Sequence, residues 1–492
     1  MAIVAAALFL AATPSATATS DALVLKSRIL ETYPSLLYVD RYRRSFPDEV
    51  QAASFWSPGT TSELKHPADL VRALTALQDH HIAVVGDKAG KAESLGLLFR
   101  TATDGAMVVW RIFDAAIGGV RAGDVVLAVD DVATQTWLTQ AATLTFGGNR
   151  RSRAAEAALD LSLGTPIKHQ TAGLSHSVRF LVQSAGEAPR SVTLDFSPMN
   201  QQRATAMIAA VNQADLRPVI RAEGVSIGTL RLGAFAPQYD AAFTAAADSA
   251  SLKPGTTDDQ AMLAGYCAVT ENFIHAFDDV ARQSDVVVLD LRGNLGGFGR
   301  VSRLMANAIA ASPPPATFDL FATSKRGMVR LTEEERDPSC GHITTLKPLV
   351  VLVDAGTRSA GEDVAAWLWA SGAPVIGERT IGAGGGYDSQ AQGFPLPESG
   401  YSVRVSGNFT LFDPREHLKD GDWSEREVVT MVSADRFSPS RDRPFAIQSV
   451  GLRPDLPMTT TLADLRDGGV AQIVSAIQQL RAEHRLEFVA SP

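Results

Sequence analysis

The pattern that most constrains the fold of this chain is a regular alternation of buried strands and helices, which begins near Val219. The strand segments VVVLDL and PLVVLV are almost entirely apolar, and the helical segments VSRLMANAIA and AGEDVAAWLWAS follow them. Strands that are apolar on both faces are typical of parallel sheets covered by helices on each side. The alternation therefore predicts an α/β domain built on a largely parallel sheet.

The length of the chain predicts further domains, because 492 residues exceed what one hydrophobic core usually organises. We expect a helical N-terminal region over 19–92, a domain of short strands over 93–197, the α/β domain over 198–482 and a tail over 483–492. Two stretches of the α/β domain, at about 250–270 and 414–440, lack a regular period. We interpret them as inserted loops.

The N-terminal residues predict export. Residues 1–18 combine an apolar, alanine-rich run with an A-x-A-like cleavage site that ends at Ala18, although no basic residue precedes the run. This pattern is typical of a secretory signal peptide, so we expect a periplasmic or secreted protein. Cys267 and Cys340 are the only cysteines. They would either pair in an oxidising compartment or remain as buried thiols.

Charge and motif content exclude several classes of function. The formal net charge of -9 argues against a nucleic-acid-binding surface, which needs a basic face. No later stretch approaches the roughly 18 uninterrupted apolar residues of a membrane span. Neither a CxxC nor an HExxH motif occurs. We therefore expect no metal and no organic cofactor.

Ser359 stands where the strand LVVLVD gives way to a helix, in the segment GTRSAGED. A serine at a sharp strand-to-helix turn exposes its hydroxyl, and the N–H of the following Ala360 points at the same space. The positive end of the helix dipole would also favour a developing oxyanion. The same residues fit a helix cap, because Glu362 stands three positions on, as in a capping box. This segment alone leaves both interpretations open.

A glycine-rich turn, DLRGNLGG, follows the preceding strand and ends at Gly297. Glycines let backbone N–H groups approach a ligand without a Cβ atom in the way. The turn contains neither G-K-[ST] nor G-x-G-x-x-G, so it does not match a phosphate-binding loop. It favours the interpretation of Ser359 as a nucleophile over the interpretation as a cap.

Five segments occur in the order found in the S41 peptidase family of C-terminal processing proteases, which includes the tricorn core protease. They are IGTLRLGAF, DLRGNLGG, LVVLVDAGTRSAGE, VIGERTIGAGGG and VGLRPDLPMTTT. The resemblance covers most of residues 79–480. It implies a crotonase/ClpP-like catalytic domain and a serine endopeptidase that works through an acyl-enzyme. By this resemblance Ser359 matches the nucleophile, and Gly297 and Ala360 match the donors of the oxyanion hole.

The catalytic base departs from the Ser/Lys branch of that family. That branch carries a lysine in G-x-x-T-x-G-K, where this chain has Ala383. The tricorn-like branch instead takes a histidine from an L-x-D-x-H segment, and LQDHH at residues 77–81 matches it. The resemblance thus identifies His81 as the general base, a role that suits a side chain titrating near neutral pH.

The groups that would support this histidine are less clear. His80 stands where the tricorn-like branch can place a serine that orients the base, and Gln448 stands where that branch has a glutamate. Gln448 cannot carry a charge. Glu362 is a further candidate acid, although its position also suits a helix cap.

Residues 93–197 resemble a PDZ domain of the bacterial protease type, through SLGLLF followed by AGDVVLAVDDV. This resemblance implies that the loop Leu95, Gly96 and Leu97 binds the carboxylate of a peptide end while the peptide adds to the sheet edge. A long insert, GGNRRSRAAEAALDLSLG, interrupts the domain and could alter that groove.

Two other functions fit the same scaffold. A catalytically impaired S41-like protein that binds peptides or other ligands would account for Gln448, whereas the intact set of Ser359, Gly297 and Ala360 argues against it. A crotonase-like hydratase or acyl-transfer enzyme would need an acyl-thioester pocket, for which the sequence gives no signal. We therefore expect protein or peptide substrates.

Overall fold

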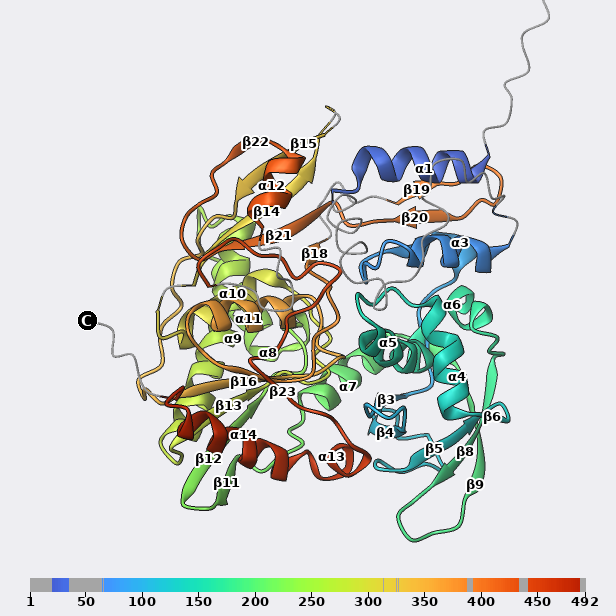
Figure 1. Cartoon of the computed structure of the whole chain (residues 1–492), viewed down its shortest axis with the longest axis horizontal. Coiled ribbons are helices and arrows are strands. Elements are labelled where there is room, and N and C mark those ends of the chain that lie inside the picture. The colour runs from blue at the N-terminus through green and yellow to red at the C-terminus, as the bar shows by residue number, and fades with distance from the viewer. Residues whose placement is uncertain are drawn as a thin grey trace, which may run out of the picture.

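The computed structural model of the chain describes residues 20–34, 64, 66–312, 314–323, 325, 327–386, 393–432 and 441–486. The expected signal peptide at residues 1–18 lies outside them. Figure 1 shows a large α/β unit on the left and a smaller sheet-containing unit at the lower right. Helices α1 and α3 lie above the smaller unit in this view. The expected mixed α/β class is confirmed.

The large unit is built on a six-stranded sheet with the order β11-β12-β13-β16-β17-β23. Neighbouring strands from β12 to β23 run parallel, and β11 joins β12 as an antiparallel edge. The bounds are β11 (Val219–Ala222), β12 (Val225–Arg231), β13 (Val286–Asp290), β16 (Leu349–Val353), β17 (Val375–Gly377) and β23 (Leu456–Pro457).

Helices cover both faces of this sheet, which explains its continuous apolar strands. In β13, Val287 and Leu289 enter one core with four helices, whereas Val286 and Val288 enter a second core with α14. The helices of the first core are α8 (Ala241–Ser251), α9 (Asp258–Ala281), α10 (Gly299–Ile309) and α11 (Ala360–Ala370), and α14 spans Val470–Ala482. The loops that follow the carboxyl ends of β13 and β16 contain Gly297 and Ser359.

The prediction of a loop at about 250–270 was wrong, because α9 occupies the stretch from Asp258 onward, after α8 (Ala241–Ser251). Thr257 and Gln260 form a capping box, in which each side chain accepts the backbone N–H of the other residue. This cap starts the helix within a stretch whose lack of a regular period suggested a loop. The other stretch, 414–440, contains β22 (Gly421–Ser424) and α12 (Glu425–Met431), and its residues 433–440 lie outside the described part.

The smaller unit contains an antiparallel sheet in the order β3-β4-β5-β8-β9, with β6 paired to β5. All of its strands fall within residues 93–197, although the domain boundaries themselves stay a prediction. The bounds are β3 (Leu97–Thr101), β4 (Met107–Ile112), β5 (Val125–Val129), β6 (Val132–Ala133), β8 (Ser177–Gln183) and β9 (Arg190–Asp195). Helices α4 (Thr134–Ala141) and α5 (Arg150–Ser162) pack on this sheet and share its core.

The N-terminal region places the segment that carries His81. Leu25 of α1 (Asp21–Thr32) and Leu74 of α3 (Pro67–Thr75) share a core with Val403. Strand β1 (Ala83–Val85) pairs with β20 (Ser402–Arg404), which pairs in turn with β19 (Phe394–Pro395). His81 stands between α3 and β1, so this packing holds it against the α/β unit.

The remaining described elements complete the frame around the site. A third large sheet has the order β18-β21-β14-β15-β22, and a small one has the order β10-β2-β7. Their other bounds are β18 (Gly385–Gly386), β21 (Asn408–Asp413), β14 (Ala316–Ala322), β15 (Met328–Glu333), β10 (Ser197–Pro198), β2 (Glu93–Ser94) and β7 (Leu163–Gly164). The short helices are α6 (Pro166–Thr171), α7 (Gln201–Asn212), α13 (Leu462–Asp467) and the 3-10 turns Asp87–Ala89, Ala142–Leu144 and Pro237–Tyr239.

Candidate active site

The fold brings together two side chains that are far apart in the sequence. The Nε2 atom of His81 lies 3.1 Å from the Oγ atom of Ser359, across a separation of 278 residues. Ser359 is half-buried and His81 is buried. A hydroxyl at hydrogen-bond distance from an imidazole nitrogen is the arrangement in which the imidazole can take the hydroxyl proton.

Ser359 occupies a strained turn at the start of α11. Its backbone has φ 49° and ψ -129°, in a region that residues with a Cβ atom rarely adopt. The helix is capped by Glu362, whose carboxylate accepts the N–H of Ser359 at 3.2 Å. Glu362 therefore supplies the cap, and the Ser359 hydroxyl faces His81.

In the glycine pair of DLRGNLGG, Gly296 lies against this serine and Gly297 lies against Phe235. A Cβ atom on Gly296 would lie 2.7 Å from the Cβ of Ser359, and a Cβ atom on Gly297 would lie 2.1 Å from the carbonyl oxygen of Phe235. Gly297 also has φ 133°, which glycine alone adopts without strain. Within the described part of the chain, the N–H groups of Gly297 and Ala360 donate to no protein acceptor. Both amides are therefore available to a substrate oxygen.

Asp354, the residue after β16, joins the two loops of the site. Its Oδ1 atom accepts the N–H of Gly293 at 2.7 Å and the N–H of Gly356 at 3.0 Å. Its Oδ2 atom accepts from Arg100 of β3 at 2.7 Å. One buried carboxylate thus links the glycine turn, the nucleophile turn and strand β3 of the neighbouring sheet. Sequence reasoning missed Asp354, although a carboxylate at the carboxyl end of a buried parallel strand is a recognisable signal.

Comparisons with known proteins find a similarity over the stretch of the chain that carries Ser359. Residues 228–410 match the model of peptidase family S41. This stretch contains Gly297, Ser359 and Ala360, whereas His81 lies outside it. Carboxyl-terminal-processing peptidase 3, chloroplastic, from Arabidopsis thaliana is 30% identical over 259 residues. That alignment covers 49% of this chain and 42% of the relative, so the chain spans less than half the length of this relative.

Solved structures extend the similarity to the rest of the fold. The structure of mature CPAF complexed with lactacystin superposes with a TM-score of 0.58 at 13% identity, and covers 94% of this chain and 98% of that one. A crystal structure of mature CPAF gives a TM-score of 0.57 at 14% identity, with coverage of 94% and 97%. At such identities these matches show a shared fold. The family model and the relative together show that this stretch of the chain is similar to peptidase family S41.

In the S41 Ser/Lys branch the position of Ala383 would carry the base. The N–H of Ala383 donates to Glu362 Oε2 at 2.7 Å, and the N–H of Gly382 donates to Glu362 Oε1 at 2.8 Å. Thr380 donates its hydroxyl to the same carboxylate at 2.5 Å. Glu362 is fully buried, and this burial raises its pKa to about 7 although the four donors oppose the shift. Glu362 thus ties the loop at 380–383 to the nucleophile turn and does not contact His81.

His80 points away from the Ser359 hydroxyl. Its Nδ1 atom lies 2.7 Å from Glu156 of α5, and its Nε2 atom lies 3.3 Å from Arg358. Burial lowers the pKa of His80, so the neutral ring donates to Glu156 and accepts from Arg358. His80 therefore connects α5 with the residue before the nucleophile, and the expected contact with the His81 ring is replaced by this one.

Gln448 is fully buried, and its amide nitrogen lies 3.4 Å from the hydroxyl of Tyr33. Asp79 is a polar group that does approach His81, and sequence reasoning quoted it as part of LQDHH without giving it a role. The N–H of His81 donates to Asp79 Oδ1 at 2.9 Å.

The expected carboxylate-binding loop is enclosed by the protein. Leu95 and Leu97 are buried, and the N–H of Leu95 already donates to the carbonyl oxygen of Ser162 at 3.0 Å. The N–H of Gly96 donates to the hydroxyl of Ser94 at 3.3 Å. The binding of a peptide carboxylate by this loop stays a prediction, and these internal bonds leave it without support.

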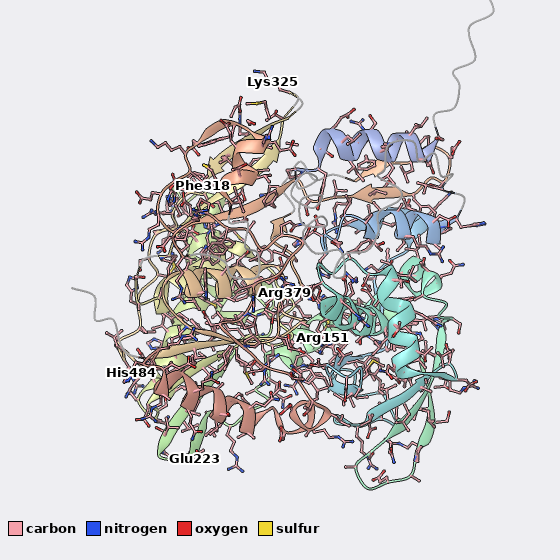
Figure 2. The ribbon with its side chains drawn as sticks, in the orientation of Figure 1. Arg151, Glu223, Phe318, Lys325, Arg379 and His484 are labelled. Atoms are coloured by element: carbon pink, nitrogen blue, oxygen red, sulfur yellow. A yellow bond between two sulfur atoms is a disulfide. The ribbon has the colours of Figure 1, made fainter. Side chains whose placement is uncertain are left out.

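Helix α5, which the long insert forms, covers the outer edge of β3. Ser162 accepts the N–H of Phe99 at 3.2 Å, and Arg151 donates to the hydroxyl of Thr101 at 2.6 Å. Arg151 also pairs with Glu378 at 2.9 Å, and Figure 2 shows this arginine between the two units. The helix thus takes the place at the sheet edge that a bound peptide would occupy.

Across the described residues, no group of three or more His, Cys, Asp and Glu side chains is arranged to hold a metal ion. None of the helices in this part of the chain is long and apolar enough to cross a membrane. Cys267 and Cys340, whose pairing the sequence left open, form a disulfide.

Proposed function

We propose that this chain is a serine endopeptidase of the Ser/His branch of family S41. The observation that carries the proposal is the 3.1 Å contact between His81 Nε2 and Ser359 Oγ. The free N–H groups of Gly297 and Ala360 beside this contact supply the second requirement of acyl transfer, a pair of donors for the oxyanion. Ala383 stands where the Ser/Lys branch has its base, and alanine cannot accept a proton.

The proposed reaction follows from these positions. His81 Nε2 takes the proton of Ser359 as Oγ attacks the carbonyl carbon of a peptide bond, and the N–H groups of Gly297 and Ala360 stabilise the negative oxygen. The tetrahedral intermediate then collapses: the C–N bond breaks, and His81 gives its proton to the departing amine. Water activated by His81 hydrolyses the acyl-Ser359 ester and restores the free serine.

Covalent labelling tests this proposal directly. A fluorophosphonate probe should label the folded wild-type chain at one residue, which mass spectrometry should identify as Ser359. Ser359→Ala should abolish labelling, and His81→Ala should slow it at least a hundredfold, because a positioned general base contributes about 10²–10⁴ in rate. His80→Ala, a neighbouring histidine turned toward Glu156, should slow labelling far less. Equal rates for the wild type and His81→Ala would overturn the Ser/His assignment.

A catalytically impaired binding protein is the second candidate, and the environment of Gln448 favours it. Where the tricorn-like branch would supply an acid, Gln448 offers a neutral amide that faces Tyr33. Folded wild-type protein that no fluorophosphonate labels, but that retains a casein-derived peptide in equilibrium dialysis, would support this candidate over the peptidase.

We limit the proposal to the α/β cleft and do not extend it to capture of a peptide end by the PDZ-like unit. The amides of Leu95 and Gly96 have internal acceptors, and α5 covers the strand edge to which a peptide would add. The substrates of the proposed reaction are therefore protein or peptide segments that reach Ser359 in extended form.

We also propose that the protein works outside the cytoplasm. The disulfide between Cys267 and Cys340 supports this location, because such bonds form and persist in oxidising compartments. Expression with residues 1–18 intact should deliver the protein to an exported fraction, and deletion of these residues should retain it in the cytoplasm. Equal distribution of the two forms would contradict the proposal.

A further inference from the structure

Asp79 is a fully buried carboxylate whose two oxygens have different partners. The Oδ1 atom accepts the backbone N–H of His81 at 2.9 Å and lies 3.7 Å from the Nδ1 atom of the same residue. The Oδ2 atom accepts the hydroxyl of Ser406 at 2.7 Å. Burial by itself would raise the pKa of Asp79, but His81 and Ser406 together bring it below its ordinary value. The side chain is therefore an anion held beside the imidazole.

The local backbone explains why this carboxylate reaches the ring. A side-chain oxygen that accepts the N–H two residues on forms an Asx turn, which folds the chain back on itself. Gln78, the residue before Asp79, has φ 51° and tightens the same turn. The D-x-H spacing of LQDHH thus places the carboxylate on the Nδ1 side of the imidazole whose Nε2 side faces Ser359.

Among the described residues, three other candidates for this role have partners of their own. His80 lies between Glu156 and Arg358, and the ring centroids of His80 and His81 are 6.1 Å apart. Glu362 accepts four hydrogen bonds from the two loops of the site. Gln448 faces Tyr33.

We propose that Asp79 is the positioning residue of His81, and that Ser406 holds Asp79 in place. The geometry joins Ser359, His81 and Asp79 into one line of contacts, with the supporting carboxylate two residues before the base. This inference rests on the proposed peptidase function. In the reaction the proton moves from Ser359 Oγ to His81 Nε2 and no further. Asp79 stays ionised, holds the Nδ1–H tautomer and stabilises the imidazolium as it forms.

The distance of 3.7 Å between Asp79 Oδ1 and His81 Nδ1 exceeds a hydrogen bond and lies within the range of an ion pair. Contacts of this kind often tighten when substrate binds, so the free enzyme shows them at their longest. The backbone N–H of His81 already fixes the carboxylate on this side of the ring.

The test compares Asp79→Asn, which keeps the shape and removes the charge, with the wild type and with Ser406→Ala. Asp79→Asn should slow fluorophosphonate labelling of Ser359 by about 10²–10⁴, since loss of an orienting carboxylate favours the wrong tautomer. It should also move the acid limb of the pH–rate profile to lower pH, because the imidazolium loses its counter-ion. Ser406→Ala, which leaves the charge in place, should slow labelling roughly fivefold to twentyfold, as expected for one lost hydrogen bond. A purely structural role would leave the pH profile unmoved.

A second readout does not depend on activity. In the wild type the ¹⁵N chemical shifts of the His81 ring should report the Nδ1–H tautomer, and in Asp79→Asn they should report a mixture of tautomers.

If the wild type is labelled and Asp79→Asn matches it in labelling rate and pH profile, the inference about Asp79 is wrong while the peptidase proposal stands. If the wild type is not labelled, the peptidase proposal fails, and an unchanged tautomer in Asp79→Asn would overturn the inference separately. Should Asp79→Asn not fold, Ser406→Ala decides, because an unaltered rate in that variant contradicts the proposed support.

Discussion

At the scale of single residues, the site depends on backbone positions that tolerate few side chains. Ser359 adopts a left-handed φ because α11 must begin directly after a sharp turn, and Glu362 stabilises that turn by accepting its N–H. The capping box and the nucleophile, which the sequence offered as alternatives, occur together. The carboxylate caps the helix, and the serine hydroxyl is left to face His81.

Gly297 provides the sharpest test of the oxyanion site. In Gly297→Ala the new Cβ would meet the carbonyl oxygen of Phe235 at 2.1 Å, so the turn must shift and move the N–H of residue 297 from its present position. We expect labelling of Ser359 to slow by about 10²–10³, the usual cost of one oxyanion donor. Gly299→Ala is the matched control, because nothing lies within 4 Å of its added Cβ. Equal labelling rates for the two variants would remove Gly297 from the site.

Glu362 predicts a pH dependence of stability. Its pKa is raised from 4.5 to about 7, so between these values the folded state holds a proton that the unfolded state has released. The free energy of unfolding should therefore fall as the pH rises through this window, by up to about 3 kcal/mol. Glu362→Gln cannot titrate and should lack this part of the pH dependence. Urea unfolding at pH 4.5 and pH 8 measures the free energy of unfolding of each protein. If that free energy changed equally between the two pH values in the wild type and in Glu362→Gln, the assignment would be contradicted.

At the scale of elements, α5 is the feature that distinguishes the smaller unit. The two residues before it contact the 380–381 loop, since the N–H of Gly148 donates to the carbonyl of Ile381 and the side chain of Asn149, the N-cap, donates to that of Thr380, both at 2.8 Å. Glu156 in its middle holds His80, and Ser162 at its end holds β3. The helix therefore ties the sheet edge to the loops around Ser359.

The position of α5 could not be predicted from the sequence. Its residues fit a helix, and the insert was expected to affect a groove. The surface on which an inserted helix packs depends on tertiary contacts, however, and these leave no pattern in the residues of the helix itself. Helix α9 was also missed, because its first turns lack a regular apolar period although Thr257 and Gln260 form a capping box there. Strands such as β13 and β16 were predictable because a strand buried on both faces appears in the sequence as a short, continuous apolar run.

Occupation of the β3 edge by α5 predicts how this unit responds to peptides. A peptide with a free apolar C-terminus, added in excess, should leave hydrogen exchange over residues 93–101 unchanged, because Ser162 already satisfies the N–H groups of Leu95 and Phe99. Ser162→Ala should speed exchange of the Phe99 amide. The amidated form of the same peptide serves as the control. Protection by the free acid alone would show that α5 can leave the edge and that the groove is functional.

At the scale of the whole molecule, the site exists only after distant segments have packed together. Ser359, Gly297 and Ala360 could be proposed from local motifs, since each follows a buried parallel strand. His81 could be proposed only through resemblance, because no local pattern connects it with a serine 278 residues away. Asp79 escaped notice because its role depends on the direction of a buried side chain. Gln448 was misplaced for the same reason, since its contact with Tyr33 crosses 415 residues.

The disulfide predicts how this assembly resists unfolding. The bond links Cys267 of α9 to Cys340 across 73 residues, and closing a loop of that length in the unfolded chain stabilises the folded state by about 4 kcal/mol. We expect the double variant Cys267→Ser, Cys340→Ser to unfold at a lower urea concentration than the wild type, with a steeper dependence of the unfolding free energy on urea because its unfolded chain is less compact. Dithiothreitol should lower the wild-type midpoint and leave that of the variant unaffected. Asp278 also holds this segment, by accepting the N–H of Thr344 and of Thr345. If the variant and the wild type unfolded at the same midpoint, these hydrogen bonds would be sufficient to fix the segment, and the bond would contribute nothing measurable to stability.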